Sequence, residues 1–432
     1  PNSLSRFRRS GPVAMTHPSE VPPDMSTPTE TVAAASSDRF KSLLRMLRVT
    51  VRPLGVVAAT LLGCQALAAS TASRSAVLAL LPDHASGARS AFLKGFALGQ
   101  AEARNCGIDP VSVDWRTVGS EQDVFLAPGS ATALLVAPFA ADLRSFAKIA
   151  QEQKLGVLLP YQRGDSLKSL AELDPQGRLH PVLPPLQVDL RKLASDTLDQ
   201  GWRRVMVVAD PGDRSADQAQ DFVEAFEALG GRVESFDSQV VQMVAPDDQA
   251  ALDQFFQDVS WKGPDAIVLA AAPEGDLARR LARAQEQGDF VVSSAMPPWV
   301  WMLPKHRVGN LAERPWHQLV LDQSAHGPGW SAFREGFVER YGQDPDLIAA
   351  SGFDSARMLS LASVAPPPVS SEGTRDPLGW MDADQEPISM CAAVQTRLEG
   401  RSVRLQGAAS DLIQRPGQAP SGVASTRLIA GR

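Results

Sequence analysis

The chain has 432 residues, of which 44% are hydrophobic and 21% are charged, so it is long enough to form two domains with sizeable cores. The formal net charge is −7, which argues against a nucleic-acid partner because there is no basic surplus to neutralise phosphates. Three cysteines are too few for a disulfide-rich scaffold, and their number does not fix the cellular compartment.

The N-terminal part of the chain changes composition twice. Residues 1–45 are rich in Ser, Thr and Pro without periodicity, which predicts a disordered or non-native leader. Residues 46–68 are predicted to be a signal peptide, because Arg48 and Arg52 precede the apolar run 54–62. That run is too short to span a membrane as a mature helix. The sequence therefore predicts that the protein is exported.

The end of this signal carries two cleavage patterns. Leu61-Leu62-Gly63-Cys64 resembles a bacterial lipobox, which implies lipidation of Cys64. Ala66-Leu67-Ala68 is an ordinary A-x-A cleavage site. We therefore expect a protein that is either anchored to a membrane through Cys64 or freely soluble.

The next hundred residues alternate between strands and helices. Apolar or alternating runs predict strands, and apolar residues at helical spacing predict helices between them. The predicted strands are 76–81, 111–118, 133–137 and 156–159, with one helix ending near residues 106–107 and another at 142–154. This alternation predicts a parallel sheet with helices on both faces.

A proline-dense segment, 179–186, separates this part from a second one. It cannot lie inside a helix, and we interpret it as the first crossing between two lobes. The second lobe contains the clearest βαβ unit of the chain, residues 201–233. Its strand 205–209 is an uncharged β-branched run, 210–213 is a turn, and the helix 215–229 ends at Gly230-Gly231.

The remaining elements continue the same alternation to the end of the chain. They are the helices 190–200, 249–259 and 276–287, the strands 266–270, 290–293 and 318–321, a second crossing at 325–329, helices 330–341 and 347–363, a polar insert at 366–384, a helix at 390–398, and strands 403–405 and 423–429.

This order of elements resembles the type I periplasmic binding proteins, the group that includes amino-acid and amide receptors of ABC importers. Its most specific part is FREGFVERYGQDPDLIAASGFDSARML, residues 333–359, with a Tyr-Gly-x-x-Pro turn followed by Phe353-Asp354-Ser355. The βαβ unit at 201–233 is similar to the family pattern as well.

The resemblance implies an α/β fold with two lobes, each a parallel sheet flanked by helices, joined by three crossings. It assigns residues 75–183 and 326–385 to the N-terminal lobe and residues 186–322 and 386–430 to the C-terminal lobe.

Ligands of open α/β sheets bind outside the carboxyl ends of the strands. The residues expected there are Asp83, Ser86, Phe139, Tyr161, Gln162, Asp210, Arg214, Glu274 and Trp299. Each has a structural alternative: Asp83 and Ser86 are favoured helix caps, Tyr161 suits hinge packing, Arg163 and Arg214 suit solvated surface, and Trp299 suits a buried anchor. Asp354 is expected to form structural hydrogen bonds within its lobe.

Several positions differ from the amino-acid receptors of this family. Those receptors hold the ligand carboxylate with small hydroxyl residues, where this chain has Pro138-Phe139 and Tyr161-Gln162-Arg163. They hold the ammonium group with acidic residues of the second lobe, for which Asp189 and Glu274 are the candidates. An unmodified amino-acid pocket is therefore not expected.

The resemblance implies an exported solute-binding protein that closes on a small polar ligand of the amino-acid or amide class, with a membrane permease as partner. A second branch of the same fold offers an alternative, because Leu80-Leu81-Pro82 and Ala137-Pro138-Phe139 also resemble envelope lipoproteins that activate a cell-wall synthase. That branch acts through contacts with a protein partner.

Sequence motifs of enzymes are missing from the chain. It contains no G-x-x-x-x-G-K-(S/T), G-x-G-x-x-G, H-E-x-x-H, G-x-S-x-G or C-x-x-C pattern, and its six histidines are scattered. We therefore expect no catalytic activity, cofactor or metal. Whether Cys106 and Cys391 form a disulfide is left open, because their spacing does not require it.

Overall fold

The structure is a computed structural model that describes residues 76–430, apart from 84, 120–131, 141, 212–214, 236–238, 272–274, 288–296, 303–315, 322–326 and 365–375. The expected leader, the signal peptide and Cys64 lie outside these described residues. Within them, no helix has the length and apolar character needed to cross a membrane.

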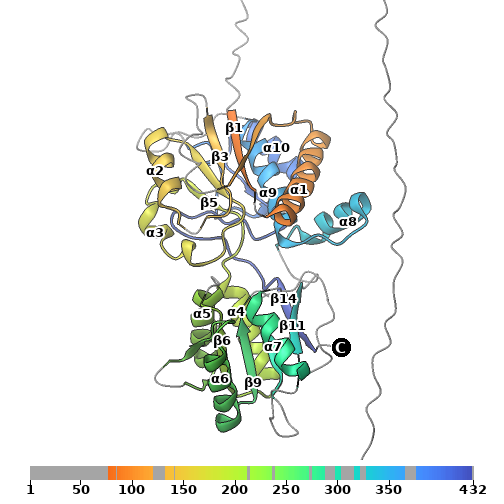
Figure 1. Cartoon of the computed structure of the whole chain (residues 1–432). Helices are drawn as coiled ribbons and strands as arrows, with labels where there is room; N and C mark the ends of the chain where they lie inside the picture. The colour runs from red at the N-terminus through yellow and green to blue at the C-terminus, as the bar shows by residue number, and fades with distance from the viewer. Residues whose placement is uncertain are drawn as a thin grey trace, which may run out of the picture. The chain divides into compact units, whose positions relative to one another are not determined.

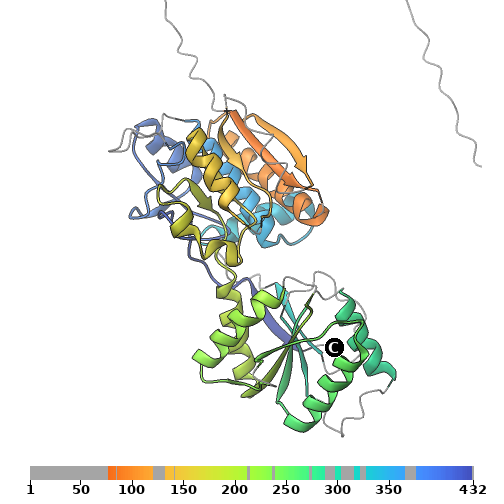
Figure 2. The ribbon, with the colours of Figure 1, turned by 60° about the vertical axis from the view of Figure 1, so that its left-hand side comes forward.

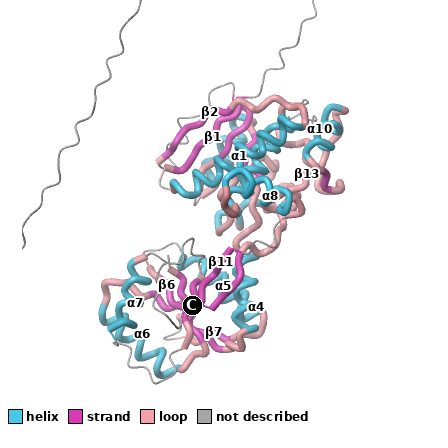
Figure 3. The backbone as a smooth tube through the Cα atoms, turned by 90° about the vertical axis from the view of Figure 1, so that its right-hand side faces the viewer, coloured by secondary structure: helices cyan, strands magenta, loops and turns pink. Residues whose placement is uncertain are grey.

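The first sheet has five strands in the order β2-β1-β3-β4-β5, all parallel. Its strands are β1 (Ala76–Pro82), β2 (Val113–Val118), β3 (Thr132–Val136), β4 (Gly156–Leu159) and β5 (Leu179–Pro181); Figure 3 shows β1 and β2 side by side. The first crossing, expected to begin at residue 179, therefore begins after β5. Pro181 is tolerated because β5 lies at the edge of the sheet.

Helices cover both faces of the first sheet, because alternate residues of each strand point to opposite faces. One face carries α1 (Ser86–Asn105), α9 (Leu347–Ala362) and α10 (Met390–Leu398). The other carries α2 (Arg144–Gln153) and the short α3 (Leu170–Leu173), which follows the 3-10 turn Asp165–Leu167. Figure 1 shows these two groups on opposite sides of the sheet, and α8 (Trp330–Tyr341) packs beside α1 and α9.

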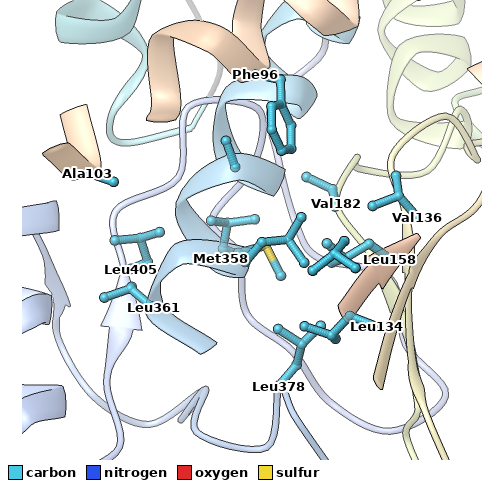
Figure 4. Packing of buried hydrophobic residues seen from close by; sticks show 14 of the residues in the cluster. Phe96, Ala103, Leu134, Val136, Leu158, Val182, Met358, Leu361, Leu378 and Leu405 are labelled. Atoms are coloured by element: carbon cyan, nitrogen blue, oxygen red, sulfur yellow. The ribbon is translucent and has the colours of Figure 1, made fainter. Parts of the chain in front are cut away.

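The core between α9 and the sheet is built from side chains far apart in the sequence. Figure 4 shows Met358 of α9 together with Leu134 and Leu158 of the sheet, and with Leu378 and Leu405 from the C-terminal part of the chain. All five side chains are at most 2% exposed. Burying such side chains stabilises the fold by about 1.5–3 kcal/mol each.

The second sheet has the order β14-β11-β10-β9-β6-β7, with β8 also paired to β6. Its parallel strands are β6 (Arg204–Ala209), β7 (Arg232–Val233), β8 (Val241–Met243), β9 (Ala266–Ala270), β10 (Trp299–Trp301) and β11 (Trp316–Leu321). The last strand, β14 (Thr426–Ala430), pairs antiparallel with β11. Figure 2 shows it, in dark blue, beside the green strands of this sheet.

Two pairs of helices cover the second sheet. α4 (Gln187–Asp199) and α5 (Ser215–Ala228) pack on one face, and α6 (Gln249–Lys262) and α7 (Asp276–Gln287) pack on the other. The strand β6 is buried on both faces from Val205 to Ala209, as its uninterrupted apolar sequence predicts. The expected fold class, two parallel sheets flanked by helices, is confirmed.

The C-terminal part of the chain divides differently from the expected boundary at residue 386. Met390 and Val394 of α10, Leu405 and Leu412 pack into the core of the first sheet, where β12 (Pro387–Ile388) pairs with β13 (Arg404–Leu405). Residues 386–430 were expected to belong to the C-terminal lobe, but of the elements in this segment only the last strand, β14, joins the second sheet. The reason is that α10 carries its apolar residues toward α1 and α9.

A disulfide joins Cys106, which ends α1, to Cys391 of α10. It links two segments that are 285 residues apart in the sequence. The pairing that the sequence left open is therefore present, and it fixes α10 to the C-terminal end of α1.

Candidate functional site

The carboxyl end of β1 places Asp83 and Ser86 at the edge of the first sheet, and both side chains are exposed. The carboxylate of Asp83 accepts a hydrogen bond of 3.4 Å from Nη1 of Arg89. The N-cap of α1 is Ala85, without a side-chain cap. Neither Asp83 nor Ser86 is therefore used as the helix cap, and both remain available at this edge.

The loops after β3 and β4 are held together by Gln162. Its Nε2 donates to the carbonyl oxygen of Pro138 over 2.6 Å, and its Oε1 accepts a bond from the backbone N–H of Tyr161. The side chain is fully buried, so Gln162 is engaged in the protein itself, contrary to its expected role as a ligand contact. Phe139, in contrast, is 45% exposed beside it.

Tyr161 follows β4 and is buried against α1, with its ring centroid 5.2 Å from that of Phe92. Among the described residues, no hydrogen-bond partner meets its hydroxyl. Burial raises the pKa of this hydroxyl, while the positive charge of Arg89 acts in the opposite direction. Burying a hydroxyl without a hydrogen-bond partner costs free energy. The Tyr161 hydroxyl and the Arg89 guanidinium group are polar groups at the carboxyl edge of the first sheet, and we call this pair the Arg89–Tyr161 spot.

Arg163 and Asp189 connect two of the crossings between the lobes. Arg163 donates to the carbonyl oxygen of Pro184 over 2.9 Å, and its Nη2 lies 2.8 Å from Oδ2 of Asp189. The carboxylate of Asp189 also accepts bonds from the backbone N–H and the hydroxyl of Ser425. Arg163 is thus an internal ion-pair partner, whereas solvated surface was expected, and Asp189 is occupied, whereas it was a candidate for a ligand ammonium group.

Asp354 has the structural role expected for it. Its side chain is fully buried and accepts hydrogen bonds of 2.8 Å from the backbone N–H groups of Ala408 and Ala409. The neighbouring carbonyl of Ala408 accepts a bond from the N–H of Gly327, next to the second crossing. Burial raises the pKa of Asp354 to about 6, and the charge of Arg357 opposes that rise.

The second sheet carries a cavity of about 830 Å³ at the carboxyl ends of its strands. Asp210, half-buried directly after β6, is the expected site residue that lines it. The other polar walls come from the loop after β8 and from α7. The lining residues are Asp210, Pro211, Ala245, Pro246, Asp247, Asp276, Arg279, Arg280 and Arg283.

The other expected residues of the second lobe do not extend this cavity. Trp299 lies within β10, is fully buried and packs against Phe255 of α6 at a centroid distance of 6.1 Å. It therefore belongs to the core, whereas a ligand contact was expected, because β10 runs between two other strands. Arg214 and Glu274 lie outside the described residues.

Comparison with known proteins finds similarity at the level of structure. No protein family model matches the sequence, and no curated protein sequence matches it. An ABC transporter substrate-binding protein from Desulfitobacterium hafniense in complex with Leu is 16% identical, with a TM-score of 0.53 over 83% of this chain and 98% of that one. A leucine binding protein from Thermotoga maritima is 16% identical, with a TM-score of 0.51 over 77% and 89%.

A branched-chain amino acid ABC transporter periplasmic ligand-binding protein from Burkholderia xenovorans gives the same TM-score as the first, 0.53, at 13% identity over 82% of this chain and 90% of that one. The chain has the type I periplasmic binding protein fold. In this fold, the polar cavity lies where open α/β sheets bind their ligands, outside the carboxyl ends of the strands.

The expected site residues did not include Arg89, Asp247 or the arginines of α7. Arg279, Arg280 and Arg283 recur within two turns of DLARRLARAQEQ, so a helical projection places Arg280 and Arg283 on one face. The sequence alone shows this spacing. Only the fold shows that these arginines lie beside the carboxyl ends of the strands. Within the described residues, no group of acidic, His or Cys side chains could hold a metal ion.

Proposed function

We propose that this protein is an exported solute-binding protein of an ABC importer. Its ligand is a small polar molecule of the amino-acid or amide class, bound in the cleft between the lobes. The observation that carries the proposal is the charged cavity at the carboxyl ends of the second-sheet strands, with Asp210 in its wall. Its volume lies within the ordinary range of ligand pockets.

The first lobe contributes the exposed edge formed by Asp83, Ser86, Phe139 and the Arg89–Tyr161 spot. The unpaired hydroxyl of Tyr161 supports a ligand role, since a polar group of the ligand would supply the missing partner. Arg214 and Glu274 remain predicted contacts of the second lobe. Lobe closure is a hinge motion about the three crossings, biased by contacts that the ligand makes only in the closed state.

Export and the membrane permease belong to the same proposal. The disulfide between Cys106 and Cys391 supports an oxidising compartment such as the periplasm. Lipidation of Cys64 would anchor the protein at the membrane surface, close to the permease.

A thermal-shift screen of amino acids and amides tests the proposed function. A ligand at a hundred times its Kd stabilises the folded state by about 2.7 kcal/mol, which raises the melting temperature measurably. Asp210→Asn should reduce the shift. Asp199→Asn is the matched control and should leave the shift unchanged, because Asp199 is an exposed carboxylate of α4 that does not line the cavity. If no compound of the panel changes the melting temperature and a cell-wall synthase co-purifies, the envelope-lipoprotein alternative replaces the receptor.

A further inference from the structure

In the cavity of the second lobe, α7 contributes three arginines but one carboxylate, Asp276. Arg279 pairs with Asp276 at the start of the helix. Arg280, half-buried, donates to the amide oxygen of Gln249, which is a neutral acceptor. In the described part of the chain, no hydrogen bond or ion pair engages Arg283, which is exposed. Two guanidinium groups therefore line the cavity without a carboxylate partner on α7.

These two guanidinium groups lie close together on the helix. Arg280 and Arg283 are three residues apart, a spacing that puts side chains on the same helix face. A guanidinium group binds a carboxylate through two parallel hydrogen bonds. Because Arg280 is half-buried, its charge is screened less by salt than that of a fully exposed arginine. The α7 wall is therefore suited to an acidic group.

The strand-end loops that line the cavity carry the other sign of charge. Asp210 follows β6, and Asp247 lies in the loop between β8 and α6. A carboxylate wall suits an ammonium group of the ligand. The cavity is thus lined by carboxylates from the strand-end loops and by guanidinium groups from α7, and a ligand that matches both walls carries charges of both signs.

We propose that the solute is an acidic amino acid or a closely similar small zwitterion with an additional acid group, and that Arg280 and Arg283 hold this acid group. This inference rests on the proposed solute-binding function and narrows its ligand class. It also distinguishes this cavity from a pocket for an apolar amino acid, in which unpaired arginine charges would oppose binding.

Isothermal titration calorimetry with L-glutamate and L-glutamine tests the inference, because the two compounds have nearly the same shape and differ in the charge of the side-chain group. We expect glutamate to bind at least about tenfold more tightly, a difference of about 1.4 kcal/mol. The preference should shrink as ionic strength rises, since salt screens the charges.

Arg283→Gln and Arg280→Gln should each weaken glutamate binding at least about tenfold and leave glutamine binding nearly unchanged. Arg191→Gln is the matched control, because Arg191 is an exposed arginine of α4 in the same lobe and does not line the cavity. Far-ultraviolet circular dichroism verifies that each variant is folded, and the exposure of Arg283 makes a folding defect unexpected for that variant.

Three results would overturn the inference. If a neutral amino acid or amide binds more tightly than glutamate, or if both arginine variants bind glutamate like the wild type, the acid group is not held by α7, while the proposed solute-binding function stands. If neither the acidic nor the neutral compounds of the full amino-acid and amide panel bind, the inference and the proposed function fail together.

Discussion

The contact between α1 and α9 permits a sharp test of the packing of the first lobe. Gly95 lies on the buried side of α1, and a Cβ atom placed on it would lie 1.8 Å from the carbonyl oxygen of Ala349 and 3.0 Å from the backbone nitrogen of Phe353. Real Cβ atoms essentially never approach within 3.0 Å. All the obstructing atoms belong to the backbone, so no side chain can rotate away.

Gly95→Ala therefore forces the two helices apart by about 1.2 Å, the difference between 1.8 Å and 3.0 Å. Overpacking of this kind costs about 1–3 kcal/mol, and sometimes more. The greater helix propensity of alanine offsets about 1 kcal/mol of that cost. Because the obstructing atoms are all backbone, we expect an overpacking cost of about 3 kcal/mol, at the upper end of the range. After the propensity gain, the net loss in the free energy of unfolding is about 2 kcal/mol.

Gly87→Ala is the matched control in the same helix. A Cβ atom at Gly87 meets nothing within 4 Å, so the substitution should be neutral or should stabilise the protein by up to about 1 kcal/mol. Both variants are compared with the wild type by urea denaturation followed by circular dichroism. The packing argument is refuted if Gly95→Ala unfolds at the same urea concentration as Gly87→Ala.

Three further predictions concern the disulfide, a buried carboxylate and the hinge. Replacing Cys106 and Cys391 by Ser should lower the free energy of unfolding by about 2–5 kcal/mol, and dithiothreitol should destabilise the wild type but not the double variant. Burial raises the pKa of Asp354 from 3.8 to about 6, so the stability it contributes is complete below pH 3.8 and is lost as the pH rises through 6. The free energy of unfolding of the wild type minus that of Asp354→Asn should therefore fall by about 3 kcal/mol between pH 4 and pH 7. An equal difference at both pH values would contradict this prediction. Asp189→Asn should lower the melting temperature through a loss of about 1–3 kcal/mol, because Arg163 keeps its charge without a carboxylate partner; an unchanged melting temperature would contradict this account of the hinge.

The sequence of this protein determined the local elements because their periodicity depends only on which face of each element is buried. The apolar run 205–209 has to be a strand covered on both sides, and the structure confirms it as β6. The apolar spacing in 215–229 likewise predicted α5. The resulting alternation of strands and helices leads to parallel sheets, and so to the fold class.

The tertiary structure alone decided which polar residues are free to meet a ligand. Gln162, Asp189 and Trp299 all follow or lie near strand ends in the sequence, yet each is occupied within the protein, by Pro138, by Ser425 and by Phe255. The hydrogen-bond partners of Gln162 and Asp189 are 24 and 236 residues away in the sequence. No local sequence pattern could therefore show these contacts.

The same physical reason explains the placement of α10 and of the arginines of α7. The helix α10 packs into the core of the first lobe through Val394 and is joined to α1 by the disulfide between Cys391 and Cys106, although its sequence fits either lobe. Arg280 and Arg283 were visible in the sequence as charges on a helix, and only the fold places them beside Asp210. Local periodicity fixes the elements, whereas the burial of distant partners against one another decides which charges remain for a ligand.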